Sequence, residues 1–101
     1  MINLDDLYDR QYTDTYTCKE YVQEVWQRIT GKDYLQQLKT QDFENLPEPI
    51  SPCIVYCHND NQTSTHVGVF YCDKVFNLQL RGPMCVDFDK LIGFTRFEYY
   101  R

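Results

Sequence analysis

The sequence predicts an α+β fold in which helices near the N-terminus pack on an antiparallel β-sheet. Apolar residues recur at helical spacing in the first part of the chain, whereas beyond residue 52 they alternate with a period of two. The segment 45–52 contains three prolines and is expected to be an irregular connection between the two parts. A chain of 101 residues suits one compact core, so we expect a single domain over residues 1–101.

The first helix is predicted from its start and stop signals. Residues 1–15 are acidic and aperiodic, and we expect an irregular lead-in there. The run Thr17-Cys18-Lys19-Glu20 then matches a capping box, in which Thr17 and Glu20 satisfy each other's backbone amides. Gly31 lies where a helix C-terminus is expected. Trp26 lies on the apolar stripe of this helix and is expected in the core.

A second, shorter helix is predicted over residues 33–43, with Tyr34, Leu35 and Leu38 facing inward. The alternating segments beyond the prolines predict a meander of antiparallel strands. The expected strands are 53–58, 66–72, 74–80 and 94–100, with a polar loop at 59–65, a turn at 81–83 and a short helix or strand at 86–92.

The composition excludes several classes of function. A formal net charge of −5 and a pI near 4.8 argue against a nucleic-acid partner, which requires a basic face. No apolar run approaches the length of a membrane span, and the acidic N-terminus lacks an apolar signal core. We therefore expect a protein that has no membrane partner and is cytoplasmic as synthesised.

The five cysteines form an odd set without disulfide-framework spacing, which is typical of reduced thiols. Cys53 and Cys57 are four residues apart on a predicted strand, which separates them by roughly 13 Å. Two thiolates at that distance cannot share one zinc ion, whose bonds to sulfur are about 2.3 Å long. We expect no metal and no cofactor.

Cys18 is a candidate nucleophile because a helix N-terminus stabilises a thiolate. The alternative is a small apolar residue that fills the first turn of the core-facing stripe. His66 opens a strand and is the candidate base, and Gly68 on the same face is expected to leave space beside it. His58 follows Cys57 on a strand and therefore faces away from it, so we expect a loop-facing polar residue.

Two stretches, "YTCKEYVQEVW" (16–26) and "HVGVFYCDKVFNL" (66–78), resemble the NlpC-type cell-wall cysteine peptidases, a bacterial and phage branch of the papain-like fold. The resemblance implies that Cys18 is the nucleophile and His66 the general base. A polar residue on the next strand would orient His66, and Asn77 is the first candidate, with Gln79 in reserve. Tyr16 and the backbone amide of Cys18 would stabilise the oxyanion.

The register of the 66–80 hairpin remains open between two turns. A four-residue loop over 70–73 would place Asn77 directly opposite His66, whereas a two-residue turn at 73–74 would place it opposite Phe70. The chain also departs from the family, because "EPISPCIVY" replaces the usual "GD" motif before the first core strand. Asp87 and Asp89 form a paired-carboxylate site only if a strand carries them, and we expect a solvated turn instead.

Two functions follow from the resemblance. The first is a thiol hydrolase that cleaves an amide bond in peptidoglycan stem peptides through an acyl-enzyme on Cys18, in a phage or prophage setting, associated with the virion or released to the cell wall. The second is a non-catalytic papain-like module, serving as a phage assembly component or as an acidic inhibitor of a host protein. Acyl transfer to an acceptor other than water would use the same residues.

Overall fold

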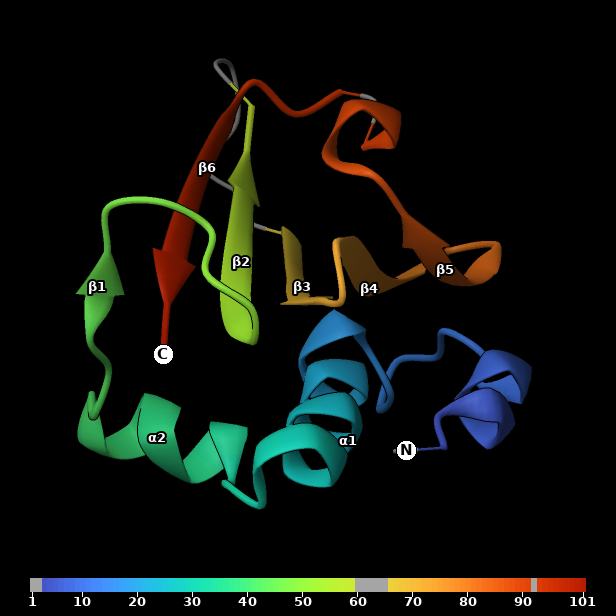
Figure 1. The fold of residues 1–101 in the computed structure, drawn as a ribbon. Coiled ribbons are helices and arrows are strands. Elements are labelled where there is room, and N and C mark those ends of the chain that lie inside the picture. The colour runs from blue at the N-terminus through green and yellow to red at the C-terminus, as the bar shows by residue number, and fades with distance from the viewer. Residues whose placement is uncertain (1–2, 60–65, 92) are drawn as a thin grey trace.

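The computed structural model describes residues 3–59, 66–91 and 93–101. This part of the chain forms an α+β fold in which two α-helices pack beside a six-stranded antiparallel sheet (Figure 1). The helices are α1 (Cys18–Thr30) and α2 (Tyr34–Thr40), and two 3₁₀ helices are η1 (Asp5–Asp9) and η2 (Phe88–Lys90). The strands are β1 (Asn45–Leu46), β2 (Cys53–His58), β3 (His66–Tyr71), β4 (Lys74–Gln79), β5 (Gly82–Val86) and β6 (Arg96–Tyr100).

The predicted limits of α1 are confirmed. The helix begins with the predicted capping box, in which the Glu20 carboxylate accepts hydrogen bonds from the Thr17 amide at 2.7 Å and from the Thr17 hydroxyl at 2.6 Å. The helix ends at Gly31, which has a φ of 77° and donates its backbone N–H to the Gln27 carbonyl. Trp26 is fully buried, as expected.

The second helix is shorter than predicted, and one of its expected inward residues is exposed. Asp33 caps α2 by accepting the Gln36 amide at 3.0 Å. Tyr34 is buried as expected, but Leu35 lies on the outer face. Gln37 takes the inward position instead, where its Oε1 accepts a hydrogen bond of 2.8 Å from Trp26 Nε1. The buried indole N–H therefore has a partner, which a leucine at this position could not provide.

Two segments predicted to be irregular contain ordered elements. The lead-in 1–15 includes η1, which buries Leu7 completely against the core. The proline-rich connection 45–52 begins with β1, a two-residue strand paired with β6. Both predictions failed because tertiary contacts order these segments, although their local sequences favour no regular structure.

The sheet has the strand order β1-β6-β2-β3-β4-β5. Strands β2 to β4 form the predicted meander and β5, which was not predicted as a strand, continues it, but β6 returns to lie between β1 and β2 (Figure 1). The turn predicted at 81–83 lies slightly earlier, at Leu80 and Arg81, because Gly82 pairs with Gln79 and is the first residue of β5. Pro83 is tolerated there because β5 is an edge strand, where a backbone N–H can be missing.

Each face of the sheet carries its own apolar core. The helix-side cluster joins α1 and η1 to one face, where α1 packs against β3 and β4. Its main buried residues are Leu7, Tyr21, Val22, Val25, Trp26, Tyr34, Ile54, Val67, Val69 and Leu78. The opposite cluster covers the other face and consists of buried Leu46, Cys53, Val55, Cys57, Phe70, Val75 and Leu91 with the rings of Phe88, Phe94, Phe97 and Tyr99. Alternation along each strand therefore decides which core a side chain joins.

Candidate functional site

The hairpin of β3 and β4 brings His66 and Asn77 together, in a register that neither predicted turn gives. Cys72 and Asp73 form the two-residue turn, with φ values of 52° and 66°, and Asn77 pairs with Gly68. Asn77 thus lies diagonally across from His66, on the same face of the sheet. Its Oδ1 is 3.0 Å from the Nε2 of His66.

The hydrogen bonds around Asn77 determine which ring nitrogen of His66 carries the proton. Asn77 is fully buried, and its Oδ1 also accepts a hydrogen bond of 3.0 Å from Gln79 Nε2. Because this oxygen is an acceptor, the His66 Nε2 must donate, and in the neutral ring Nδ1 then has the lone pair. Burial lowers the pKa of His66 below its usual 6.5, which favours that neutral ring near pH 7.

Gly68 has a different role from the one expected. A Cβ at this position would lie 2.9 Å from the Phe76 carbonyl oxygen and 3.2 Å from the Asn77 Cβ. The space beside His66 is therefore filled by β4 and is not an open cleft. The missing side chain allows β3 and β4 to approach closely where Asn77 leans toward His66.

Cys18 is half-buried at the first position of α1 and packs against the helix-side cluster, as its place on the apolar stripe predicts. His66 lies on the opposite face, where its ring stacks on Phe94 with centroids 5.4 Å apart and planes tilted by 11°. Both residues are in the described part of the chain, and no hydrogen bond joins the thiol to the imidazole. The structure thus brings together His66, Asn77 and Gln79, and it does not bring Cys18 into contact with them.

Tyr16, the candidate oxyanion donor, makes a different interaction. Its hydroxyl donates to the Glu24 carboxylate, which also accepts two hydrogen bonds of 3.0 Å from Arg10. Burial and the neighbouring carboxylate together raise the pKa of Tyr16. The hydroxyl therefore belongs to an ionic network that fixes the lead-in against α1.

The remaining cysteines differ in accessibility. Cys53 and Cys57 are completely buried, and desolvation raises the pKa of both thiols, that of Cys57 to about 12. Cys72 is exposed on the hairpin turn, and Cys85 is half-buried. Within the described residues, no cluster of three or more histidine, cysteine or acidic side chains is placed to hold a metal ion.

His58 was also placed wrongly by the sequence prediction. It does not face a loop: its side chain is only 16% exposed, and its Nε2 lies 2.8 Å from the Oε1 of Glu98 on β6. The signal was its two-residue spacing from Tyr56, which puts both on the helix side of the sheet. The sequence could not reveal Glu98 as the partner, because the pairing of β2 with β6 is non-local.

The two acidic residues at the start of η2 are exposed, in agreement with a solvated turn. Asp87 accepts a hydrogen bond of 2.7 Å from Lys74 and makes an ordinary surface ion pair. Asp89 lies within the single turn of η2.

Comparisons with protein-family models, curated proteins and solved structures found no match for this chain. None of the helices described is long and apolar enough to cross a membrane.

Proposed function

We propose that the protein is a thiol hydrolase with a papain-like, NlpC-type arrangement, and that it cleaves an amide bond in peptidoglycan stem peptides. Cys18 is the nucleophile, His66 is the base, and Asn77 positions the imidazole. The observation that supports this proposal best is the 3.0 Å hydrogen bond between His66 Nε2 and Asn77 Oδ1. It is the interaction expected between a catalytic histidine and the residue that orients it.

The state of His66 suits a general base. Asn77 holds the proton on Nε2, so Nδ1 is the nitrogen that accepts a proton from the thiol. Burial keeps the ring neutral near pH 7, as a base must be before the reaction begins. The Gln79–Asn77–His66 chain, in which Asn77 is fully buried, restricts rotation of the ring, because turning it would leave the Asn77 oxygen with one donor fewer.

In the proposed reaction, His66 Nδ1 takes the thiol proton and the sulfur of Cys18 attacks the amide carbon. The C–N bond breaks, the imidazolium gives its proton to the departing amine, and a thioester to Cys18 remains. Water, deprotonated by His66, then cleaves the thioester and releases the carboxylate product. In this proposal the backbone amide of Cys18, at the start of α1, would stabilise the developing negative charge. In the substrate-free structure the sheet lies between the thiol and the ring, so this reaction requires a rearrangement that places both groups on one side of the sheet.

A second candidate function is a non-catalytic module that binds a phage or host protein. One observation favours it: Cys18 and His66 contact different apolar clusters in the absence of substrate. The net charge of −5 suits a basic partner surface. The two candidates differ in the reactivity of Cys18.

The two candidate functions can be distinguished by alkylation with iodoacetamide at pH 6. Mass spectrometry then gives the extent of labelling at each cysteine. The hydrolase requires Cys18 to react faster than Cys72, which is the exposed thiol and serves as the internal reference. His66→Ala should slow the labelling of Cys18, whereas His58→Ala should leave it unchanged.

Cys18 labelling at or below the rate of Cys72 in the wild type contradicts the hydrolase, and the search then turns to binding partners. Fast labelling that depends on His66 should be followed by digestion of purified muropeptides, with Cys18→Ser as the inactive control. The products identify the scissile bond.

A further inference from the structure

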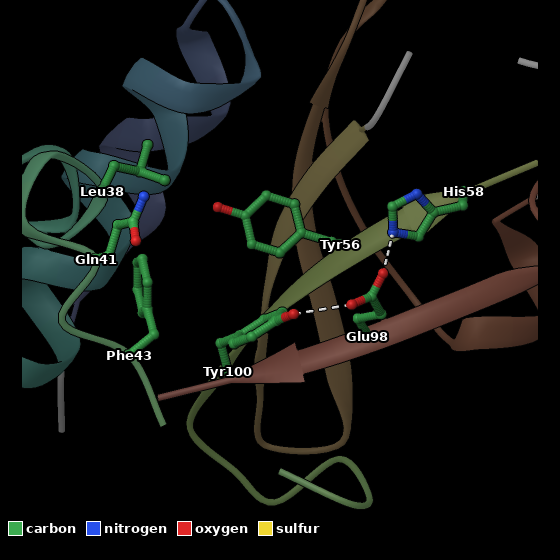
Figure 2. Close-up of a pocket in the computed structure, with 7 residues that line it drawn as sticks. All are labelled: Leu38, Gln41, Phe43, Tyr56, His58, Glu98 and Tyr100. Atoms are coloured by element: carbon green, nitrogen blue, oxygen red, sulfur yellow. Dashed lines mark hydrogen bonds and ion pairs between the residues drawn. The ribbon is translucent and has the colours of Figure 1, made fainter. Parts of the chain in front are cut away.

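A cavity of about 390 Å³ opens on the helix side of the sheet, between α2 and strands β2 and β6 (Figure 2). Three rings form much of its wall. Tyr100 meets Phe43 and Tyr56 edge to face, with centroids 5.9 Å and 5.6 Å apart. The Tyr56 hydroxyl is hydrogen-bonded to that of Tyr34 at 2.6 Å, which fixes its ring in place. The cavity is thus built from rigid aromatic groups and has the size of a small-molecule site.

The described lining of the cavity contains one carboxylate, that of Glu98, whose Oε1 lies 2.8 Å from His58 Nε2. Among the described residues that line it, Glu98 is the acidic one and none is a lysine or an arginine. The Tyr100 hydroxyl donates to Glu98 Oε2 at 2.8 Å, and this hydrogen bond is the main reason why the pKa of Glu98 is lowered. Figure 2 shows the carboxylate between His58 and Tyr100, beside the aromatic wall. Glu98 is 38% exposed, so it can still accept a further hydrogen bond from a ligand.

We infer that this cavity binds an alkylammonium group on a short aliphatic chain. The ring faces attract a cation, and Glu98 supplies the opposite charge for a charge-assisted hydrogen bond. Leu38, at the α2 side, provides apolar contact for the methylene chain. The Glu98 carboxylate repels an anionic ligand, the described lining contains no lysine or arginine, and the imidazole of His58 is already directed at Glu98. Two sources share this chemistry, a free amine and the side chain of a lysine-like residue in a peptide.

This inference does not depend on the proposed hydrolysis, because ligand binding is measured without turnover. The experiment records tyrosine ring resonances by NMR while n-pentylammonium, n-pentanol or n-pentanoate is added to the whole protein. These probes share one chain length and differ in the charge of the head group. We expect n-pentylammonium to shift the Tyr56 and Tyr100 resonances and to bind about tenfold or more tightly than n-pentanol, as a charge-assisted contact implies.

Glu98→Gln keeps the size of the side chain and removes its charge, so it should abolish the preference for the ammonium probe. Glu48→Gln is the matched control, since Glu48 is exposed in the connection before β2. Equal affinity for pentylammonium and pentanol in the wild type overturns the inference, and this comparison needs no variant. Retention of the preference in Glu98→Gln overturns it as well.

The two sources are then compared with 1,5-diaminopentane and Nα-acetyl-lysine amide. Tighter binding of the diamine supports a free amine, and tighter binding of the lysine derivative supports a peptide side chain. If neither of these two probes binds, the inferred ligand class is wrong.

Discussion

His66 and Asn77 share a 3.0 Å hydrogen bond although they are not partners in the β3–β4 register. The partner of Asn77 is Gly68, two residues further along β3 on the same face. Because Gly68 has no Cβ, the Asn77 side chain occupies the space above it and leans toward the ring. The contact therefore depends on His66 and Asn77, which form the hydrogen bond, and on Gly68, which lacks a side chain that would block it.

Asn77→Asp tests the electrostatic part of this contact. A carboxylate at hydrogen-bonding distance favours the imidazolium, so the pKa of His66 should rise from its lowered value by about one unit or more. NMR titration of the His66 ring measures the change. Asn45→Asp, on the exposed residue that begins β1, is the control and should leave His66 unaffected. An unchanged His66 pKa in the Asn77→Asp variant would show that this side chain does not face the ring.

The pH dependence of stability should carry the signature of His66. Its pKa is lowered in the folded protein, so the unfolded chain binds the proton first as the pH falls. The free energy of unfolding should therefore decrease as the pH falls from about 6.5 toward the lowered folded value. Urea unfolding at pH 7.5 and 5.5 should show a smaller loss in His66→Gln than in the wild type. An identical loss in both proteins contradicts the assignment.

The carboxylates act in a different pH window. The pKa of Asp6 is lowered to about 2 by its hydrogen bonds with Arg28, and that of Glu24 is lowered mainly by Arg10. The stability that these groups contribute is present above their unfolded pKa values of about 4 and is lost only as the pH falls below them. The difference in the free energy of unfolding between pH 7.5 and 5.5 therefore reports mainly on the histidines and not on these carboxylates.

Gly68→Ala should destabilise the hairpin by overpacking. The added methyl would lie 2.9 Å from the Phe76 carbonyl oxygen and from Val75 Cγ1, and relieving this contact should cost about 1–3 kcal/mol of the free energy of unfolding. Gly31→Ala is a control of a different kind, because nothing lies within 4 Å of its Cβ and its cost of about 1 kcal/mol comes from the positive φ. Hydrogen exchange should accelerate in β3 and β4 only for Gly68→Ala. If hydrogen exchange in β3 and β4 of the Gly68→Ala variant equals that of the wild type, the close approach of the two strands at Gly68 is contradicted.

Glu20→Ala should remove the capping interaction at the start of α1. The Thr17 amide and hydroxyl both lose their acceptor, and we expect a loss of about 1 kcal/mol in the free energy of unfolding. Chemical denaturation measures it, with Glu48→Ala as the control at an exposed glutamate. If Glu20→Ala and Glu48→Ala lower the free energy of unfolding equally, the capping interaction does not stabilise the protein.

Local signals predicted α1 well, because the capping box and Gly31 act within one turn of the helix ends. They failed for β1 and for the place of β6, since Asn45 pairs with Tyr100 and no local pattern encodes a partner 55 positions away. The hairpin turn was missed because Cys72 adopts a positive φ that glycine or asparagine would normally signal.

The candidate site was predictable to a similar degree. The resemblance named His66 and Asn77 as a pair, and the structure places them within hydrogen-bonding distance. It did not predict that the His66 ring would face Phe94 while Cys18 packs on the other side of the sheet. Which face a strand presents to a helix depends on packing across the whole domain, and the alternation of residues 66–71 fits either choice.

The position of β6 in the sheet has a consequence for folding. Strand β2 is flanked by β3 on one edge and by β6 on the other, and β6 is the last strand in the chain. Until β6 docks, a folding intermediate exposes an unpaired β2 edge rich in Ile54, Val55 and Cys57, which are fully buried in the finished protein. At high protein concentration such an edge can accept the β6 segment of a second molecule in place of its own. High concentrations during refolding should therefore favour strand-exchanged dimers and aggregates, and dilution should favour the monomer.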